Sequence, residues 1–138
     1  MRVRPTRRDA GFTLIEVLTV VVIIAVLAAI LLATFLRARA QSAVSASKGN
    51  VKNIATALET YFTDNNEYPS ALAALVPTYA RAIPNDPCTD TPYTYEISTG
   101  GSSPVDYKIS IAYPLTNGCR IIVSGISYTP GGGLLDSP

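Results

Sequence analysis

The most conspicuous pattern in the chain is a long block of apolar residues. From Phe12 to Leu36 the one charged side chain is Glu16, and no glycine or proline interrupts the run. As a helix, Phe12–Leu36 would be about 37 Å long at 1.5 Å per residue. That length is enough to cross the roughly 30 Å hydrocarbon core of a bilayer. We therefore predict a membrane-spanning helix over residues 12–36.

A helical pattern continues beyond this block, but it becomes amphipathic. Lys48, Lys52 and Glu59 give one face a polar character, while apolar residues recur on the other at steps of three, four and seven. These apolar residues are Val44, Val51, Ile54, Ala55, Leu58, Tyr61 and Phe62. Asp64-Asn65-Asn66 is a stop signal. We predict that residues 37–66 continue the helix and pack an apolar stripe under a head domain.

The remaining residues, 67–138, have the pattern of a small α+β head. Ser70 is a candidate cap for a short helix over 71–76, and prolines then mark an extended loop. Alternation of apolar and polar residues predicts strands over 93–97, 107–113 and 120–128. The simplest arrangement is a three-stranded antiparallel sheet packed on the second half of the helix. The glycine-rich tail near residues 130–133 is predicted to be mobile.

Charge placement indicates how the chain would sit in a membrane. Basic residues precede the apolar block at positions 2, 4, 7 and 8, and only Arg37 and Arg39 follow it closely. This bias favours a cytoplasmic N-terminus and an exported head. The formal net charge is +1, and the sequence contains no basic face of the kind that binds nucleic acid. Histidine is absent, which removes the commonest general base and metal ligand.

Cys88 and Cys119 both lie in the part that would be exported, where disulfides persist. A bridge between them would restrain the unfolded chain by roughly 3–4 kcal/mol. The alternative is a pair of unpaired buried thiols.

The apolar block has three possible interpretations. Ala38-Arg39-Ala40 imitates the cut site of a secretory signal, but the block is longer than such signals and contains a carboxylate. A plain single-span anchor leaves Glu16 unexplained, and an ionisable residue in a membrane segment is by default a functional hypothesis. A third interpretation uses Gly11: a cut after this residue would give Phe12 a free amine, four residues before Glu16.

The run Arg8-Asp9-Ala10-Gly11-Phe12-Thr13-Leu14-Ile15-Glu16-Val17 resembles the type III signal of type IV pilins and type II secretion pseudopilins. This resemblance implies the type IV pilin fold and cleavage between Gly11 and Phe12 by a prepilin peptidase that also methylates the Phe12 amine. It further implies that Glu16 serves methylation or assembly, and that the chain polymerises through its helix. Many relatives have glycine at Ala25 and proline at Ala33, in a stretch that can unwind. Tyr68-Pro69 and Ile83-Pro84-Asn85-Asp86-Pro87 resemble the loop of major pseudopilins and related pilins.

Elementary electrostatics fits this resemblance. The Phe12 amine of one subunit and the Glu16 carboxylate of a neighbour would attract by roughly 4 kcal/mol at about 4 Å and an effective dielectric constant near 20. Such a pair would offset the cost of burying each charge and would set the register of adjacent subunits. The alternative is that Glu16 sits among lipid headgroups.

We therefore expect a leader peptide at 1–11, a transmembrane and filament-core helix at 12–36, its amphipathic continuation at 37–66 and a disulfide-bonded head at 67–138. The expected protein is a structural subunit of a helical filament, serving adhesion, twitching motility or DNA uptake. The resemblance implies that its partners are copies of itself, the peptidase, an assembly platform and an outer-membrane channel. It would start in the inner membrane and end in a periplasmic or cell-surface filament. The alternatives are a type II secretion pseudopilin and a single-span binding protein.

Catalysis, cofactors and metals are not expected. No nucleophile has a basic partner and no glycine loop for phosphate is present. Asp86, Asp90 and Asp106 suggest calcium, but that ion needs six to eight oxygens. Major pseudopilins carry a calcium site near the C-terminus, and here the tail offers only Asp136.

Overall fold

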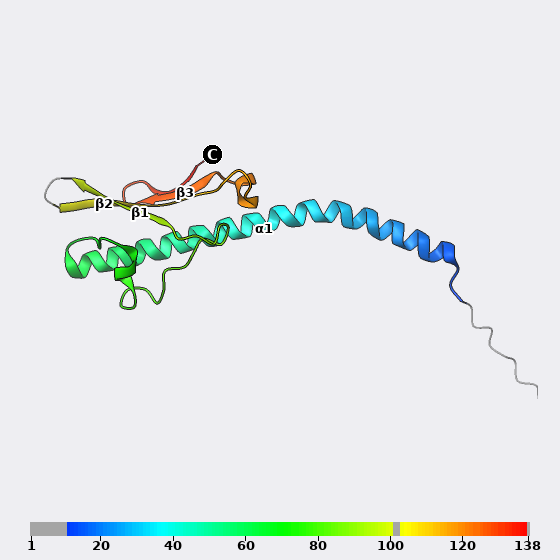
Figure 1. The fold of residues 1–138 in the computed structure, drawn as a ribbon, viewed down its shortest axis with the longest axis horizontal. Helices are drawn as coiled ribbons and strands as arrows, with labels where there is room; N and C mark the ends of the chain where they lie inside the picture. The colour runs from blue at the N-terminus through cyan, green and yellow to red at the C-terminus, as the bar shows by residue number, and fades with distance from the viewer. Residues whose placement is uncertain (1–10, 101–102, 138) are drawn as a thin grey trace, which may run out of the picture. The chain divides into compact units, whose positions relative to one another are not determined.

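The computed structural model describes residues 11–100 and 103–137, and the chain divides into two compact units, Met1–Leu36 and Arg37–Pro138. Helix α1 covers Leu14–Asn65 (Figure 1). The elements that follow are the 3-10 helix η1 (Leu72–Leu75), strands β1 (Thr94–Gly100) and β2 (Ser103–Ala112), the 3-10 helix η2 (Gly118–Ile121) and strands β3 (Gly125–Thr129) and β4 (Gly133–Ser137). One long helix followed by an antiparallel sheet confirms the predicted α+β class.

In the first unit, the described residues are exposed along the whole of the helix. Among the residues that the structure describes, α1 is the one helix long and apolar enough to cross a membrane. The helix is unbroken through Ala25 and Ala33, both good helix formers. Thr34 Oγ1 donates to the Leu31 carbonyl at 2.9 Å, so this hydroxyl is satisfied within the helix.

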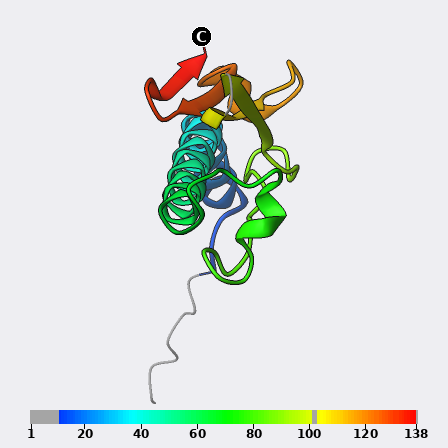
Figure 2. The same cartoon turned by 90° about the vertical axis from the view of Figure 1, so that its left-hand side faces the viewer.

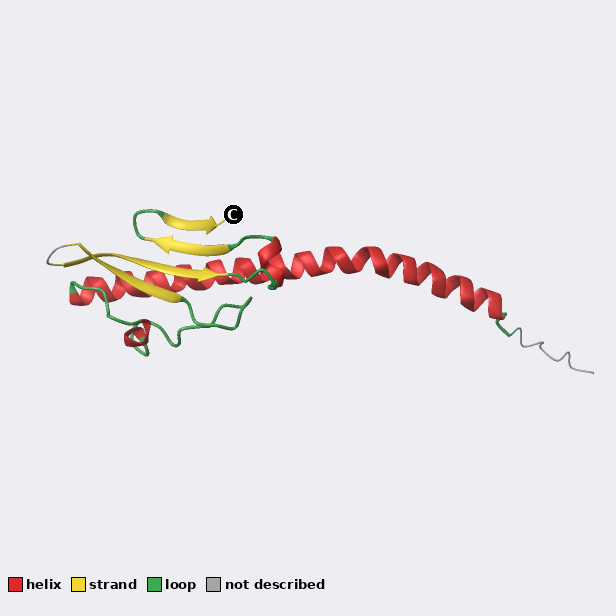
Figure 3. Cartoon of the chain, turned by 45° about the horizontal axis from the view of Figure 1, so that its top comes forward, coloured by secondary structure: helices red, strands yellow, loops and turns green. Residues whose placement is uncertain are grey.

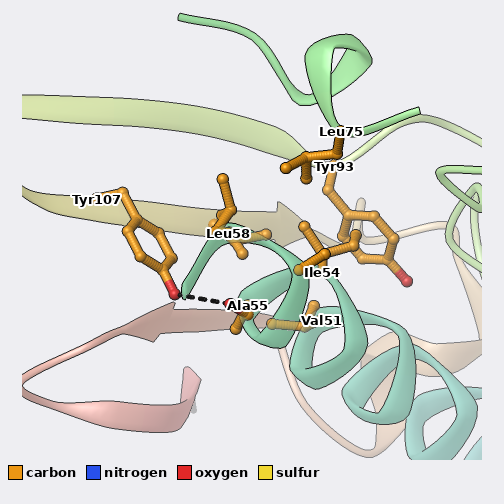
Figure 4. Packing of buried hydrophobic residues seen from close by; sticks show 9 residues of the cluster. Val51, Ile54, Ala55, Leu58, Leu75, Tyr93 and Tyr107 are labelled. Carbon is orange, nitrogen blue, oxygen red and sulfur yellow. Dashed lines mark hydrogen bonds between the residues drawn. The ribbon is translucent and has the colours of Figure 1, made fainter. Parts of the chain in front are cut away.

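In the second unit, the sheet lies on one side of the helix and has the order β1-β2-β3-β4, with every neighbouring pair antiparallel. The segment that carries η1 runs along another side (Figure 2). Buried side chains from the helix, η1 and the sheet form the main core (Figure 4). The predicted stripe supplies its helical half, with Val51, Ile54, Ala55 and Leu58 buried and Tyr61 packed at the margin.

The helix ends where the sequence indicated. Asn66 adopts a positive φ of 57°, a conformation that asparagine tolerates better than most residues. Its N–H donates to the Phe62 carbonyl at 2.7 Å, which satisfies one of the carbonyls left free at the helix end.

The sheet has four strands, so the predicted three-stranded sheet and mobile tail are wrong. β4 pairs with β3 from Thr129↔Gly133 to Gly125↔Ser137 (Figure 3). The glycines make this possible: Gly133 has a φ of 68°, and Gly132 N–H donates to Thr129 Oγ1 at 3.0 Å. The glycine triplet, whose composition predicts a mobile tail, forms the turn of a hairpin in the structure.

Two local predictions also need correction. The third strand starts at Gly125 rather than Arg120, because Asn117 Oδ1 accepts from Cys119 N–H at 2.8 Å and caps η2. Ser70 does not cap η1, which is a single turn preceded by Ala71 without a side-chain cap. The first two strands lie near the predicted positions, with β1 beginning at Thr94 and β2 extending further toward the N-terminus, to Ser103.

Candidate processing and assembly site

The predicted cleavage bond lies in exposed, non-helical chain. Residues 11–13 precede the helix, and Phe12 is 88% exposed. A Cβ placed on Gly11 would meet no heavy atom within 4 Å, so the backbone there is open to approach. The rest of the predicted leader, residues 1–10, lies outside the described residues. A peptidase needs accessible backbone that is free of helical hydrogen bonds, and the Gly11–Phe12 bond meets this requirement.

Glu16 makes reciprocal hydrogen bonds with Thr13 at the start of the helix. Its Oε2 accepts from Thr13 N–H at 2.8 Å and from the Thr13 hydroxyl at 2.7 Å. In return, Thr13 Oγ1 accepts from Glu16 N–H at 3.3 Å. This is a capping box, in which two helix-end donors that would otherwise be free are satisfied reciprocally.

Sequence reasoning overlooked the role of Thr13, although the signal was present. Thr13-Leu14-Ile15-Glu16 has the spacing that defines a capping box, with serine or threonine followed three residues later by glutamate or glutamine. The Glu16 carboxylate also lies in the first turn of the helix, where the helix dipole favours negative charge.

The apolar residues after this cap cover all sides of the helix. From Ile15 to Leu36 the large apolar side chains are 52–65% exposed. A helix that is apolar all round must be covered by lipid or by other helices. The same surface therefore suits a membrane first and a bundle of identical helices afterwards.

In the head, the structure joins Cys88 and Cys119 in a disulfide, with Cα atoms 6.1 Å apart. This confirms the predicted bridge, and the alternative of two unpaired thiols is wrong. Cys119 is buried in a second cluster with Val44, Tyr113 and Ile126. The bridge thus ties the proline-rich loop to the turn that carries η2.

Asp86, one of the three candidate calcium ligands, is used by the protein itself. It is 1% exposed, and its Oδ2 accepts from Cys88 N–H, Thr89 N–H and the Thr89 hydroxyl at 2.9–3.0 Å. Its Oδ1 accepts from the Tyr113 hydroxyl at 3.2 Å. In the described part of the chain, no group of three or more acidic, histidine or cysteine side chains could hold a metal ion. Asp86 therefore orders the loop that presents Cys88.

Several tyrosines belong to the core of the head rather than to a binding site. The hydroxyls of Tyr68 and Tyr107 both donate to Glu59 Oε1, at 3.2 and 3.1 Å. Burial, followed by the charge of Glu59, raises the pKa of Tyr68 to about 12, and burial raises the pKa of Tyr95 to about 12. These phenols stay neutral at physiological pH and act as hydrogen-bond donors inside the fold.

Comparison with known proteins agrees with this geometry. A family model described as the prokaryotic N-terminal methylation motif matches residues 6–32. The chain is 38% identical over 117 residues to type II secretion system core protein G of Pseudomonas aeruginosa, which covers 72% of this chain and 81% of the relative. It is 43% identical over 61 residues to type IV major pilin protein PilA of Myxococcus xanthus, covering 44% of this chain and 28% of that one. A third relative is type IV wide pilus major component PilA4 of Thermus thermophilus, 38% identical over 78 residues, or 56% of this chain and 60% of PilA4.

The exposed apolar helix, its capped start and the disulfide-bonded head define a structural subunit of the pilin class. The match to core protein G extends through most of both chains, well beyond the methylation motif. The chain belongs to the family of type IV pilins and type II secretion pseudopilins.

Proposed function

We propose that this protein is a structural subunit of a type IV pilus-like filament, without catalytic activity of its own, that polymerises through its N-terminal helix. The observation that carries the proposal is the large apolar side chains of residues 12–36, which are more than half exposed on every side of the helix. Exposing so large an apolar surface to water is unfavourable, and covering it with lipid or with copies of the same helix removes that cost.

The proposed pathway has two stages. The precursor is held in the inner membrane by residues 12–36, and a prepilin peptidase cuts it between Gly11 and Phe12 and methylates the new Phe12 amine. An assembly platform then extracts the cut subunit into a periplasmic or cell-surface filament that passes an outer-membrane channel. Support for the first stage comes from the exposed backbone at Gly11 and from the methylation motif over residues 6–32.

Glu16 links the two stages. In the single chain, both Thr13 donors bind to Oε2, so Oε1 remains available to a further donor. We propose that the Phe12 amine of a neighbouring copy takes this position in the filament. Two opposite charges in a low-dielectric bundle stabilise each other, whereas removal of one leaves the other buried and unpaired.

Mass spectrometry of the isolated protein tests the processing step. We expect an intact mass that corresponds to a chain starting at Phe12 and carrying one added methyl group. A chain that still begins with Met1 would contradict the proposal and leave a single-span anchored binding protein as the alternative.

A matched pair of variants tests the role of Glu16. Glu16→Gln keeps the capping box, because glutamine also caps at this position, but it removes the charge. Thr13→Ala removes the cap, at a cost of about 0.5–2 kcal/mol, and keeps the charge. We expect Glu16→Gln to enter the membrane and be cut but to yield few filaments, and Thr13→Ala to assemble. The reverse result would show that Glu16 acts only as a cap.

A pseudopilus of type II secretion is the second candidate filament. The coverage of the relatives favours this candidate. The match spans 81% of the length of core protein G, but only 28% of PilA and 60% of PilA4. A deletion strain separates the two candidates. Loss of sheared surface filaments, with loss of motility or DNA uptake, indicates a pilus; loss of protein secretion with surface filaments intact indicates a pseudopilus.

A further inference from the structure

The head carries a one-directional charge pattern along α1. Residues 37–52 contain Arg37, Arg39, Lys48 and Lys52 and no acidic residue. Residues 53–80 contain Glu59, Asp64 and Glu67 and no basic residue. Lys48 is already paired with Asp136 of β4, and Arg81 lines one pocket with Asn53 and Ile54 near the middle of this stretch. Within the described residues, the unpaired contrast is therefore between Arg37 and Arg39 at one end of the helix and Asp64 and Glu67 at the other, which we name the Arg37 end and the Asn65 end.

Within one subunit, the negative charges at the Asn65 end are electrostatically unfavourable. Asp64 lies in the last turn of α1, where the structure has no basic residue, and the partial negative charge of a helix C-terminus repels a carboxylate. Asp64 and Glu67 are both exposed, whereas Glu59 is held by the hydroxyls of Tyr68 and Tyr107. Asp64 and Glu67 are thus available to a partner that carries positive charge.

The basic end carries an apolar patch. Cys119 places η2 beside α1, with its Sγ 3.8 Å from the Ala40 carbonyl oxygen, and η2 lies over this part of the helix in Figure 1. Around this contact Leu115 is 84% exposed and Ile121 is 61% exposed. Arg120 stands between them in sequence and donates to the Tyr113 carbonyl at 3.1 Å, which holds its guanidinium at the patch.

We propose that the Arg37 end of one subunit docks on the Asn65 end of a second copy, with Leu115 and Ile121 at the centre of the contact. The charges argue for this partner, since each end of the head is complementary to the opposite end of the next. At 1.5 Å per residue, Arg39 and Asp64 are about 38 Å apart along α1, so the two copies are displaced by about this distance along the helix axis.

Such a contact is heterologous, because it joins two different surfaces of the same molecule. Heterologous contacts that do not close into a ring extend without limit into a helical assembly. This inference rests on the proposed filament function and adds a second interface, made by the heads, to the one made by the apolar helices. Phe62, which stacks on Tyr68 with ring centroids 4.7 Å apart, is half-buried at the Asn65 end and offers apolar surface to the patch.

Charge reversal in the full chain, expressed in cells that assemble the wild type, tests the docking. The acid-end variant is Asp64→Arg with Glu67→Arg, and the base-end variant is Arg37→Glu with Arg39→Glu. Each places like charges together, so we expect about a tenfold or larger fall in sheared filament for each. The four changes combined restore the pairing and should return the yield to within about threefold of wild type, because the two ends again attract.

Controls keep this test specific. Arg81→Glu reverses an exposed base that lines a pocket with Asn53 and Ile54, about midway along α1 between Arg39 and Asp64, and it should assemble normally. The amount of cut subunit in the membrane shows whether each variant is inserted and processed. If the combined variant fails to recover, or the acid-end variant assembles normally, the docking is refuted. A defect confined to the base-end variant indicates that Arg37 and Arg39 bind anionic lipid headgroups instead. If the wild-type chain forms no filament at all, the proposed function itself has failed.

The apolar patch is tested separately. Leu115→Ser with Ile121→Ser should lower the filament yield about fivefold or more, because the centre of an interface carries most of its binding energy. Leu135→Ser, at an exposed position of β4, is the matched control and should leave the yield unchanged. Thermal unfolding of each purified variant shows whether the head is intact. A patch variant that melts like wild type and assembles like wild type would overturn the assignment.

Discussion

The strongest quantitative prediction concerns the Cys88–Cys119 bridge. The two residues are 31 positions apart, and closing a loop of this size lowers the entropy of the unfolded chain by about 12 cal/mol/K, or roughly 3.7 kcal/mol at 25 °C. A change of 1 kcal/mol shifts the melting temperature of a head of this size by about 4–8 °C. Replacing both cysteines by alanine should therefore lower the melting temperature by about 15 °C or more.

The assay is thermal unfolding of the full chain in detergent, followed by the near-ultraviolet circular dichroism of its tyrosines. Reduced wild type is the matched control, since it lacks the bridge but retains both sulfur atoms. It should melt close to the double alanine variant. The double serine variant should melt lower still, because position 119 is buried among Val44, Tyr113 and Ile126, and a hydroxyl buried there without a partner costs about 1–3 kcal/mol.

A small shift would refute this reasoning. If the double alanine variant melts within about 5 °C of oxidised wild type, the unfolded chain must already be restrained, or the loop must be held by other contacts. Asp86 is the first candidate for such contacts, because its carboxylate binds the N–H groups of Cys88 and Thr89.

Three further predictions concern the head alone. Gly125→Ala should destabilise it by about 1–3 kcal/mol, because the new Cβ would lie 2.6 Å from the Ile111 carbonyl oxygen. Gly49→Ala has open space around it and should stabilise α1 by about 1 kcal/mol. Urea unfolding measures the change in the free energy of unfolding for both variants. Asp86→Ala should cost about 2–4 kcal/mol in the same assay, because it leaves the buried Tyr113 hydroxyl and the half-buried N–H groups of Cys88 and Thr89 without their acceptor. A cost below about 1 kcal/mol would contradict this. The pKa values of Tyr68 and Tyr95 are raised to about 12 each, so the unfolded chain loses its phenolic protons at lower pH than the folded head does. The free energy of unfolding should therefore be constant below about pH 10 and fall between about pH 10 and 12. A free energy of unfolding that stays constant from about pH 10 to 12 would contradict this.

The features that the sequence predicted are those that depend on local patterns. The helix from the apolar block to Asn65 follows from periodicity and an unbroken run of good helix formers. The buried face of its second half follows from the spacing of Val51, Ile54 and Leu58. The disulfide follows from the expected compartment and from having two cysteines to pair. The helix and its buried face depend on the periodicity of neighbouring residues, and the disulfide depends only on the chemistry of exported cysteines.

The features that were missed depend on contacts between distant segments. β4 forms because a glycine turn returns the chain to β3, and Leu134 then packs against both clusters of the core. An isolated Gly-Gly-Gly run carries no sign of such a partner. Asp86 was considered as a metal ligand, and only the fold reveals that Tyr113 and the loop donors occupy its oxygens. Cross-strand and loop contacts of this kind are settled by the tertiary structure.

The capping box at the start of the helix bears on the assembly role that we propose for Glu16. Within the low-dielectric interior of a membrane or filament, unsatisfied N–H groups at a helix end are costly, and the Thr13–Glu16 capping box removes part of that cost. The same bonds hold the Glu16 carboxylate at the helix start in one orientation before any partner arrives. In the assembly that we propose, the amine of a neighbouring subunit would meet an acceptor whose conformational entropy has already been lost. We therefore expect a loss of the cap to slow assembly without abolishing it, whereas loss of the charge removes the attraction itself.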